Sequence, residues 1–193
     1  MTMEVAPETV ALVHRAHGGD PAALNELLGE LRPLVVRTAR LIVGSGSWAA
    51  EDAAQEALVD ISQGIAGLRD PAAVKVWALR IATRHAVRAA RKERLLRVRS
   101  SRLVPELLAS AAMDGRAAAL KEAFDRLPPR LRATAVLRLQ TGLSEDEAAA
   151  ILGCSVGTVK SNLHDARRRL TWTLTDAGYT PTVERQEVPD DQS

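Results

Sequence analysis

A long row of apolar residues at helical spacing constrains the fold of this chain more than any other feature. Between residues 21 and 43, apolar residues recur three and four positions apart, which places them on one side of an α-helix. They are Leu24, Leu27, Leu28, Leu31, Leu34, Val35, Ala39 and Ile42. Asp20 and Pro21 start this helix as an N-cap and a proline at the first helical position. The stripe predicts an amphipathic helix that packs against others.

The rest of the chain is equally suited to helices. Ala, Leu, Arg and Glu recur throughout, whereas long runs of Val, Ile, Tyr and Thr are missing, which argues against a β-sandwich or barrel. Between residues 100 and 116 the pattern weakens, because Pro105 and Gly115 interrupt short apolar runs. We therefore predict an all-α fold of two small helical domains. Its parts are a domain over residues 8–99, a flexible linker over 100–116, a domain over 117–176 and a disordered tail over 177–193.

Several classes of protein are disfavoured by composition. Cys154 is the single cysteine, so no internal disulfide forms, and no CxxC or Cys/His cluster offers a metal site. The N-terminus lacks a basic leader with an apolar core, and no run of about 18 apolar residues occurs. We expect a cytoplasmic protein with no membrane insertion, no metal and no cofactor. The 26 Lys and Arg residues nearly balance the 24 Asp and Glu residues, which leaves a net charge of only +2. Affinity for nucleic acid therefore depends on where the positive charge is concentrated.

Residues 143–170 carry the most specific pattern. Ser144 and Glu147 form a capping box, Gly153 allows a tight turn, and Ser155 caps the next helix. In that helix the apolar residues share one narrow arc, which leaves its outer face polar. The pattern predicts a helix-turn-helix with an exposed recognition helix, and an ordinary helical hairpin is the alternative.

Together with RLPPRLRATAVLRLQTGLS over residues 126–144, this string closely resembles DNA-binding region 4 of bacterial sigma factors of the extracytoplasmic-function (ECF) type, in the sigma-70 family. Leu-Pro-Pro-Arg, Gly-Leu-Ser, Ala-x-x-Leu-Gly and Ser-Val-Gly-Thr-Val-Lys-Ser stand in family order. The resemblance implies recognition of the minus 35 promoter element by Ser155, Thr158, Lys160, Ser161, His164, Asp165 and Arg168. Asp165 stands where an arginine often reaches DNA, and it either reads a cytosine or pairs with Arg168 or Arg169.

The N-terminal half holds an acidic segment that fits the same resemblance. Residues 51–60 carry four carboxylates and no basic residue. They resemble the family's region 2.2, which grips the clamp helices of the polymerase β′ subunit. The implied contacts are Asp52, Gln55, Glu56 and Asp60. The alternative is an acidic face that is merely solvated.

A basic segment follows. Residues 80–102 hold nine Lys and Arg against the single Glu93. They resemble regions 2.3 and 2.4, which open and capture the minus 10 element, and such a stripe with an aromatic ring suits phosphates beside unstacked bases. The implied contacts are Trp77, Arg80, Arg84, His85, Arg88 and Arg91. For Trp77 the alternative is half-burial between helices, and His85 stands where many relatives have Asn.

The favoured function is that of an alternative sigma factor, which binds core RNA polymerase (β and β′ subunits) and promoter DNA and directs promoter-specific transcription initiation. Members of this family are often held by an anti-sigma factor, which adds such a protein to the candidate partners. A stand-alone helix-turn-helix regulator is the alternative, but it leaves the acidic segment without a purpose. An enzyme is disfavoured, because the four histidines form no HExxH and the chain has no phosphate-binding glycine loop.

Overall fold

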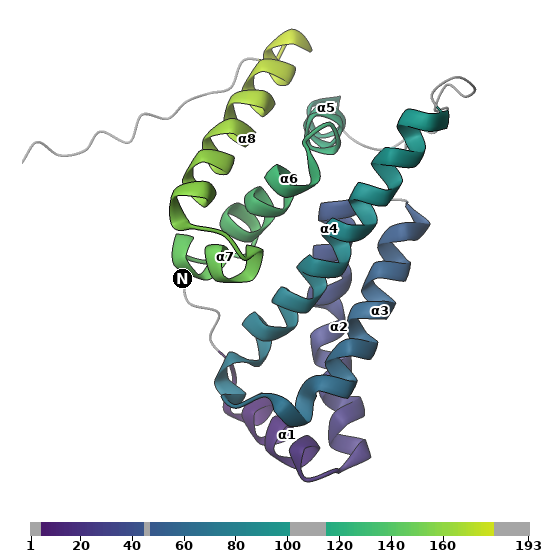
Figure 1. Ribbon diagram of the computed structural model, residues 1–193, viewed down its shortest axis with the longest axis vertical. Coiled ribbons are helices and arrows are strands. Elements are labelled where there is room, and N and C mark those ends of the chain that lie inside the picture. The colour runs from purple at the N-terminus through teal and green to yellow at the C-terminus, as the bar shows by residue number, and fades with distance from the viewer. Residues whose placement is uncertain (1–4, 45–46, 101–114, 180–193) are drawn as a thin grey trace, which may run out of the picture.

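Two groups of helices make up the protein, one on each side of residues 101–114 (Figure 1). The computed structural model describes residues 5–44, 47–100 and 115–179, and every regular element within these ranges is helical. The predicted all-α class is thereby confirmed. Most of the predicted linker and nearly all of the predicted tail lie outside the described residues. No described helix is both long enough and apolar enough to span a lipid bilayer.

The N-terminal group is a bundle in which three long helices run side by side and a short helix crosses one end (Figure 1). Its long helices begin at caps formed by nearby residues. The Asp20 carboxylate accepts hydrogen bonds from the amides of Ala22 and Ala23, and the Ser47 hydroxyl accepts one from Ala49. The elements are α1 (Pro7–His17), α2 (Pro21–Val43), α3 (Trp48–Gly64), the short 3-10 turns η1 (Ile65–Gly67) and η2 (Pro71–Ala73), and α4 (Val74–Ser100).

The core of this bundle combines large side chains from α2 with small ones from α3 and α4. On α2, Leu27, Leu31 and Ile42 are almost completely buried. The facing helices contribute rows of buried alanines at helical spacing: Ala50, Ala54 and Ala57 on α3, and Ala78, Ala82, Ala86 and Ala90 on α4. Small side chains let two helix backbones approach closely. The outer faces of α3 and α4 therefore become neighbours.

The C-terminal group consists of shorter helices packed along the longest one, α8. One hydrogen bond of the wide π type ends the η3 segment, from the Thr141 amide to Val136 O (3.2 Å). The Leu143 amide then donates to Leu137 O, six residues earlier (3.2 Å). The chain then turns into the next helix at Ser144. The elements are α5 (Gly115–Asp125), α6 (Pro129–Ala135), the π-helical η3 (Val136–Gln140), α7 (Glu145–Leu152) and α8 (Val156–Asp176).

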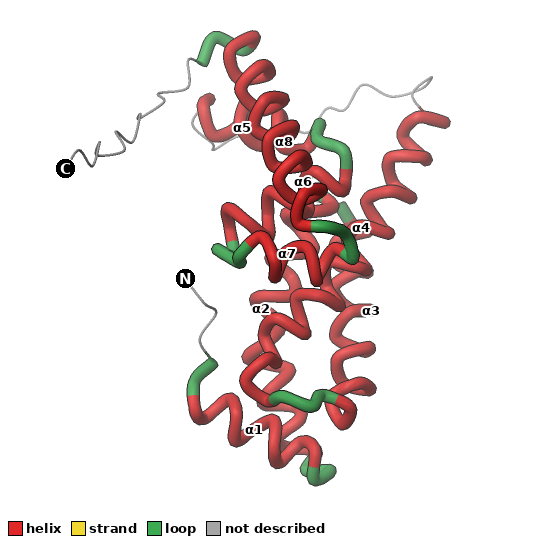
Figure 2. The backbone as a smooth tube through the Cα atoms, turned by 60° about the vertical axis from the view of Figure 1, so that its left-hand side comes forward, coloured by secondary structure: helices red, strands yellow, loops and turns green. Residues whose placement is uncertain are grey.

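The two groups pack against each other through α6, η3 and α7 on one side and α2 and α4 on the other (Figure 2). Ala133 and Val136 join the buried core of the N-terminal bundle. Conversely, Leu79 of α4 belongs to the core of the C-terminal group, together with Leu137 and Leu143. Nothing in the helical periodicity indicates this contact.

Candidate nucleic-acid and protein interfaces

An acidic face lies on the side of α3 that points away from the bundle core. Ala53, Ala57 and Ile61 are buried, so the residues between them turn outward. Among the predicted polymerase contacts, three are exposed and one is partly exposed: Asp52, Gln55, Glu56 and Asp60. The helix packs on α2, α4 and η1, which leaves this face turned toward solvent.

His85 joins the acidic face to α4. Its Nδ1 lies 3.0 Å from Glu56 Oε2 and its Nε2 lies 2.8 Å from Asp60 Oδ2. Both ring nitrogens of His85 therefore lie within hydrogen-bond distance of a carboxylate of α3. The His85 side chain is only 12% exposed. The ring therefore faces α3, although the resemblance assigns His85 to promoter DNA.

Asp60 has a second partner on α4. Arg84 Nη2 lies 2.7 Å from Asp60 Oδ2. The hydrogen bond from His85 is the main cause that lowers the pKa of Asp60 below its usual value, and Arg84 adds to it. Two of the predicted polymerase contacts, Glu56 and Asp60, are thus paired with residues of the predicted minus 10 surface.

The basic face runs along the exposed side of α4. Arg80, Arg88 and Arg91 are exposed, and so is Arg84 beside Asp60. Trp77 differs, because it is half-buried and packs against the bundle core. A Cβ atom added at Gly64 would lie only 3.1 Å from the Trp77 ring, so α3 and this ring are in close contact. The half-burial expected as the alternative is what the structure has.

The predicted helix-turn-helix is formed by α7 and α8. The Ser144 hydroxyl accepts from the Glu147 amide (3.1 Å), and Glu147 Oε2 accepts from the Ser144 amide (2.6 Å). This backbone hydrogen bond is the main cause that lowers the pKa of the Glu147 carboxyl. Gly153 has a left-handed φ of 62°, and the Ser155 hydroxyl accepts from the Thr158 amide (3.1 Å). These local bonds set the angle at which α8 leaves the turn.

The outer face of α8 carries the residues predicted to reach the minus 35 element. Val159, Leu163 and Ala166 are buried, which turns Lys160, Ser161 and His164 outward. Five of the predicted site residues have partners within the protein. Ser155 Oγ lies 2.9 Å from Thr158 Oγ1, Lys160 Nζ lies 3.5 Å from Glu145 Oε2, and Asp165 Oδ1 lies 3.7 Å from Arg168 Nη2. The pairing alternative for Asp165 is therefore present.

Arg132 of α6 is a residue that the sequence patterns did not single out. It is only 6% exposed and donates hydrogen bonds to backbone carbonyls of α2. The available signal was its register, because Arg132 lies three and four residues before the apolar Ala135 and Val136. A charged residue within an apolar stripe must find buried partners.

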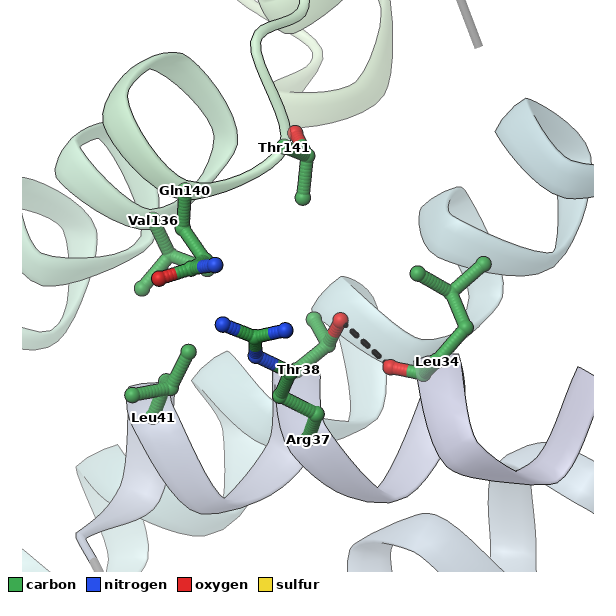
Figure 3. A pocket seen from close by; sticks show the side chains of 7 residues that line it. All are labelled: Leu34, Arg37, Thr38, Leu41, Val136, Gln140 and Thr141. Atoms are coloured by element: carbon green, nitrogen blue, oxygen red, sulfur yellow. Dashed lines mark hydrogen bonds between the residues drawn. The ribbon is translucent and has the colours of Figure 1, made fainter. Parts of the chain in front are cut away.

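Other kinds of site are scarce in the described part of the chain. Within it, no three His, Cys, Asp or Glu side chains gather where they could hold a metal ion. A pocket of about 200 Å³ opens between α2 and η3, lined by Leu34, Arg37, Thr38, Leu41, Val136, Gln140 and Thr141 (Figure 3). The Arg37 guanidinium and the Gln140 amide both point into it (Figure 3). The seam between the two groups is therefore polar and open at this point.

Comparison with known proteins identifies both groups of helices. Residues 27–95 match the family model for sigma-70 region 2, and residues 117–170 match that for sigma-70 region 4. The ECF RNA polymerase sigma factor SigD of Mycobacterium tuberculosis H37Rv is 30% identical over 200 residues, covering 92% of each chain. The chain belongs to the ECF sigma factor family. Sigma factors are DNA-binding regulators of transcription initiation rather than enzymes, and this ECF protein is an alternative sigma factor of that kind.

Two further relatives extend the match over most of the ECF chain. The sigma factor ShbA of Streptomyces griseus is 32% identical, covering 83% of this chain and 92% of that one. Among solved structures, the sigma factor RpoE of Bartonella quintana, crystallised with the anti-sigma factor NepR, superposes with a TM-score of 0.62. It is 26% identical, and the match covers 78% of this chain and 96% of RpoE. The similarity thus includes both groups of helices.

Proposed function

We propose that this ECF sigma factor binds core RNA polymerase through the acidic face of α3 and directs initiation at promoters that α4 and α8 recognise. The observation that carries the proposal is the separation of charge on one bundle. Carboxylates line the outer side of α3, and arginines line the neighbouring side of α4. An acidic face suits a basic helix of a protein partner, whereas a basic face suits the phosphates of DNA.

The two DNA-binding surfaces are assigned to different promoter elements. On α4, Arg80, Arg88 and Arg91 are exposed and free to reach phosphates at the minus 10 element. On α8, Lys160, Ser161 and His164 face outward at the start of the recognition helix, which suits base edges in a major groove. Thr158 lies near the N-terminus of α8, where the helix dipole favours a phosphate.

Partners and compartment follow from this role. Core polymerase and promoter DNA are the required partners, which assigns the protein to the cytoplasm. The similar RpoE structure contains an anti-sigma factor, so we extend the proposal to a regulatory protein of that class. No catalytic step is assigned to the chain.

Transcription in a reconstituted system tests the proposal. Core polymerase and this protein should together produce a run-off transcript from a promoter selected with the holoenzyme, and neither should do so alone. The triple substitution Asp52→Ala, Gln55→Ala and Glu56→Ala should weaken binding to core polymerase without changing the helical content, because all three side chains are exposed.

A matched control tests whether polymerase binding depends on the acidic face of α3 or only on the number of acidic residues. Asn25→Ala with Glu26→Ala removes an exposed amide and an exposed carboxylate from α2, and it should leave polymerase binding unchanged. If the α3 triple variant binds polymerase as tightly as the wild type, the assignment of this face is wrong. Sequence-specific DNA binding as a dimer without polymerase would instead support the stand-alone regulator.

A further inference from the structure

Trp48, the first residue of α3, holds its ring out into solvent. It is 86% exposed, more than any other large apolar residue in the described part of the chain. A tryptophan that becomes buried removes about 150–250 Å² from water, which makes it one of the strongest contributors to protein interfaces. The ring of Trp48 therefore offers a large apolar surface that the described helices do not cover.

The backbone that carries this ring is fixed from two sides. The Ser47 hydroxyl accepts from the Ala49 amide (3.1 Å) and donates to Glu93 Oε1 of α4 (2.9 Å). Arg40 Nη2 of α2 lies 2.7 Å from Glu51 Oε1 in the first turn of α3. An aromatic ring on a fixed backbone loses little conformational freedom when a partner covers it. The start of α3 is thus preorganised for binding.

The ring lies on the same side of α3 as the predicted polymerase contacts. Four side chains fall within an arc of about 60° on an ideal helix at 100° per residue. They are Trp48, Asp52, Gln55 and Val59. Val59 is itself 52% exposed, and it lies about 17 Å from Trp48 along the helix axis at 1.5 Å per residue. The acidic face therefore has an apolar residue at each end and polar residues between them.

The charge of this face selects the kind of partner. A single exposed apolar residue is ordinary on a protein surface, but here two of them share one arc with polar contacts. The carboxylates of Glu51, Asp52 and Glu56 repel the phosphates of DNA. A protein helix that presents apolar side chains beside Lys and Arg matches both parts of the face. Because α3 lies on the outer side of the bundle, away from α6 and α8, the face is open to such a helix (Figure 1).

We propose that Trp48 is the apolar anchor through which the acidic face of α3 binds core RNA polymerase, with Val59 as a smaller contact at the other end. This inference rests on the proposed function. It assigns most of the affinity at this face to burial of the ring, whereas the carboxylates orient the partner and steer its approach. The polymerase surface that receives Trp48 is then an apolar pocket beside basic residues.

The affinity of the full-length protein for core polymerase, measured at two salt concentrations, tests the anchor. Trp48→Ala should weaken binding about thirtyfold, which corresponds to the roughly 2 kcal/mol of an interface hot spot. This loss should be nearly the same at about 0.1 M and about 0.5 M salt, because apolar burial is not screened. The loss in the triple variant Asp52→Ala, Gln55→Ala and Glu56→Ala should shrink at the higher salt, because its charges are screened.

Two further variants serve as controls. Trp48→Phe keeps an aromatic ring and should recover most of the affinity that Trp48→Ala loses. Leu95→Ala truncates a residue of α4 that is 62% exposed on the same bundle but outside the acidic face, and it should leave polymerase binding unchanged. Circular dichroism should match the wild type in all of these variants, because the side chains that they change are exposed.

The outcomes separate the anchor from the proposed function. Wild-type affinity in Trp48→Ala, with weaker binding by the triple variant, overturns the anchor and leaves the proposed function standing. Weaker binding by Trp48→Ala, with wild-type affinity in the triple variant, supports the anchor and removes the carboxylates from the proposed function. A Trp48→Ala loss that disappears at the higher salt overturns the anchor. So does a Trp48→Ala protein that binds core polymerase normally but forms a holoenzyme that binds promoter DNA poorly, because the ring then contacts DNA.

Discussion

At position 165 a carboxylate stands on the DNA-facing helix, 3.7 Å from the Arg168 guanidinium. This pairing occupies Asp165 and lowers the positive charge that Arg168 offers to a phosphate. Both side chains are well exposed, so the pair itself stabilises the helix little. Its effect is expected on DNA rather than on folding.

We predict that Asp165→Ala tightens binding to minus 35 DNA by a similar factor for all sequences. The substitution removes a negative charge near phosphates and frees Arg168, and neither change depends on the bases. Binding of holoenzyme to a set of promoters that differ at single minus 35 positions measures the factor. A loss of preference at one position only, of about 1 to 3 kcal/mol, would instead mean that Asp165 reads a cytosine.

Asp60 makes stability depend on pH. Because its pKa is lower in the folded protein than the ordinary 3.8, its contribution is present above pH 3.8 and is lost as the pH falls through the folded value. Asp60→Asn should therefore lower Tm by about 2 °C at pH 6, since this group is partly exposed and screened. The difference from the wild type should shrink below about pH 4.

The control for Asp60 is Asp52→Asn, on the same acidic face. Among the described residues Asp52 makes no ion pair, so this substitution should give nearly the same Tm as the wild type at both pH values. Thermal unfolding followed by circular dichroism provides the measurement. A difference for Asp60→Asn that is as large at pH 3 as at pH 6 would show that packing, not charge, explains the effect.

At the level of the element, three sides of α4 have three different surroundings. Its alanine row packs on the bundle, Leu79 packs on the C-terminal group, and its arginines face solvent. Along this solvent face Arg84 is already paired with Asp60, whereas Arg88 and Arg91 have exposed guanidinium groups available for phosphates.

We therefore predict unequal effects within the basic face. Arg88→Ala and Arg91→Ala should each reduce the slope of log affinity against log salt by about 0.9, the value for one lost phosphate contact on duplex DNA. Arg84→Ala should reduce it less. Arg32→Ala on α2, also exposed, should leave the slope unchanged. Equal slopes in the wild type and the Arg88 and Arg91 variants would exclude α4 from the DNA.

For the whole molecule, the shared core makes folding of the two groups cooperative. Ala133 and Val136 complete the core of the bundle, and Leu79 completes the core of the C-terminal group. A group that separates from its partner therefore exposes apolar surface on both sides. Such coupling usually merges two unfolding events into one.

Calorimetry should show a single unfolding transition for the wild type and two for Leu79→Ala. The substitution removes a buried side chain that links the groups, at a cost of about 2 to 5 kcal/mol, while each group keeps the rest of its core. Leu139→Ala, which truncates an exposed leucine of η3, should retain one transition. One cooperative transition in Leu79→Ala would mean that the seam does not couple the groups.

Local features of this protein were determined by its sequence alone. The caps at Asp20, Ser144 and Ser155 all form as predicted, because each bond joins residues two or three positions apart. The helix-turn-helix and the outward side of α8 follow in the same way, since the turn at Gly153 and the apolar arc are encoded within one short segment.

Tertiary packing alone decided which side chains meet across elements. Periodicity places His85 and Trp77 on α4, but only the close approach of α3 turns His85 toward Glu56 and Asp60 and covers part of the Trp77 ring. Arg132 depends still more on the complete fold, because its partners Ile42 and Val43 are about 90 residues away. Such a bond needs both groups folded and docked, and no local pattern records a geometry that arises only when two distant surfaces come together.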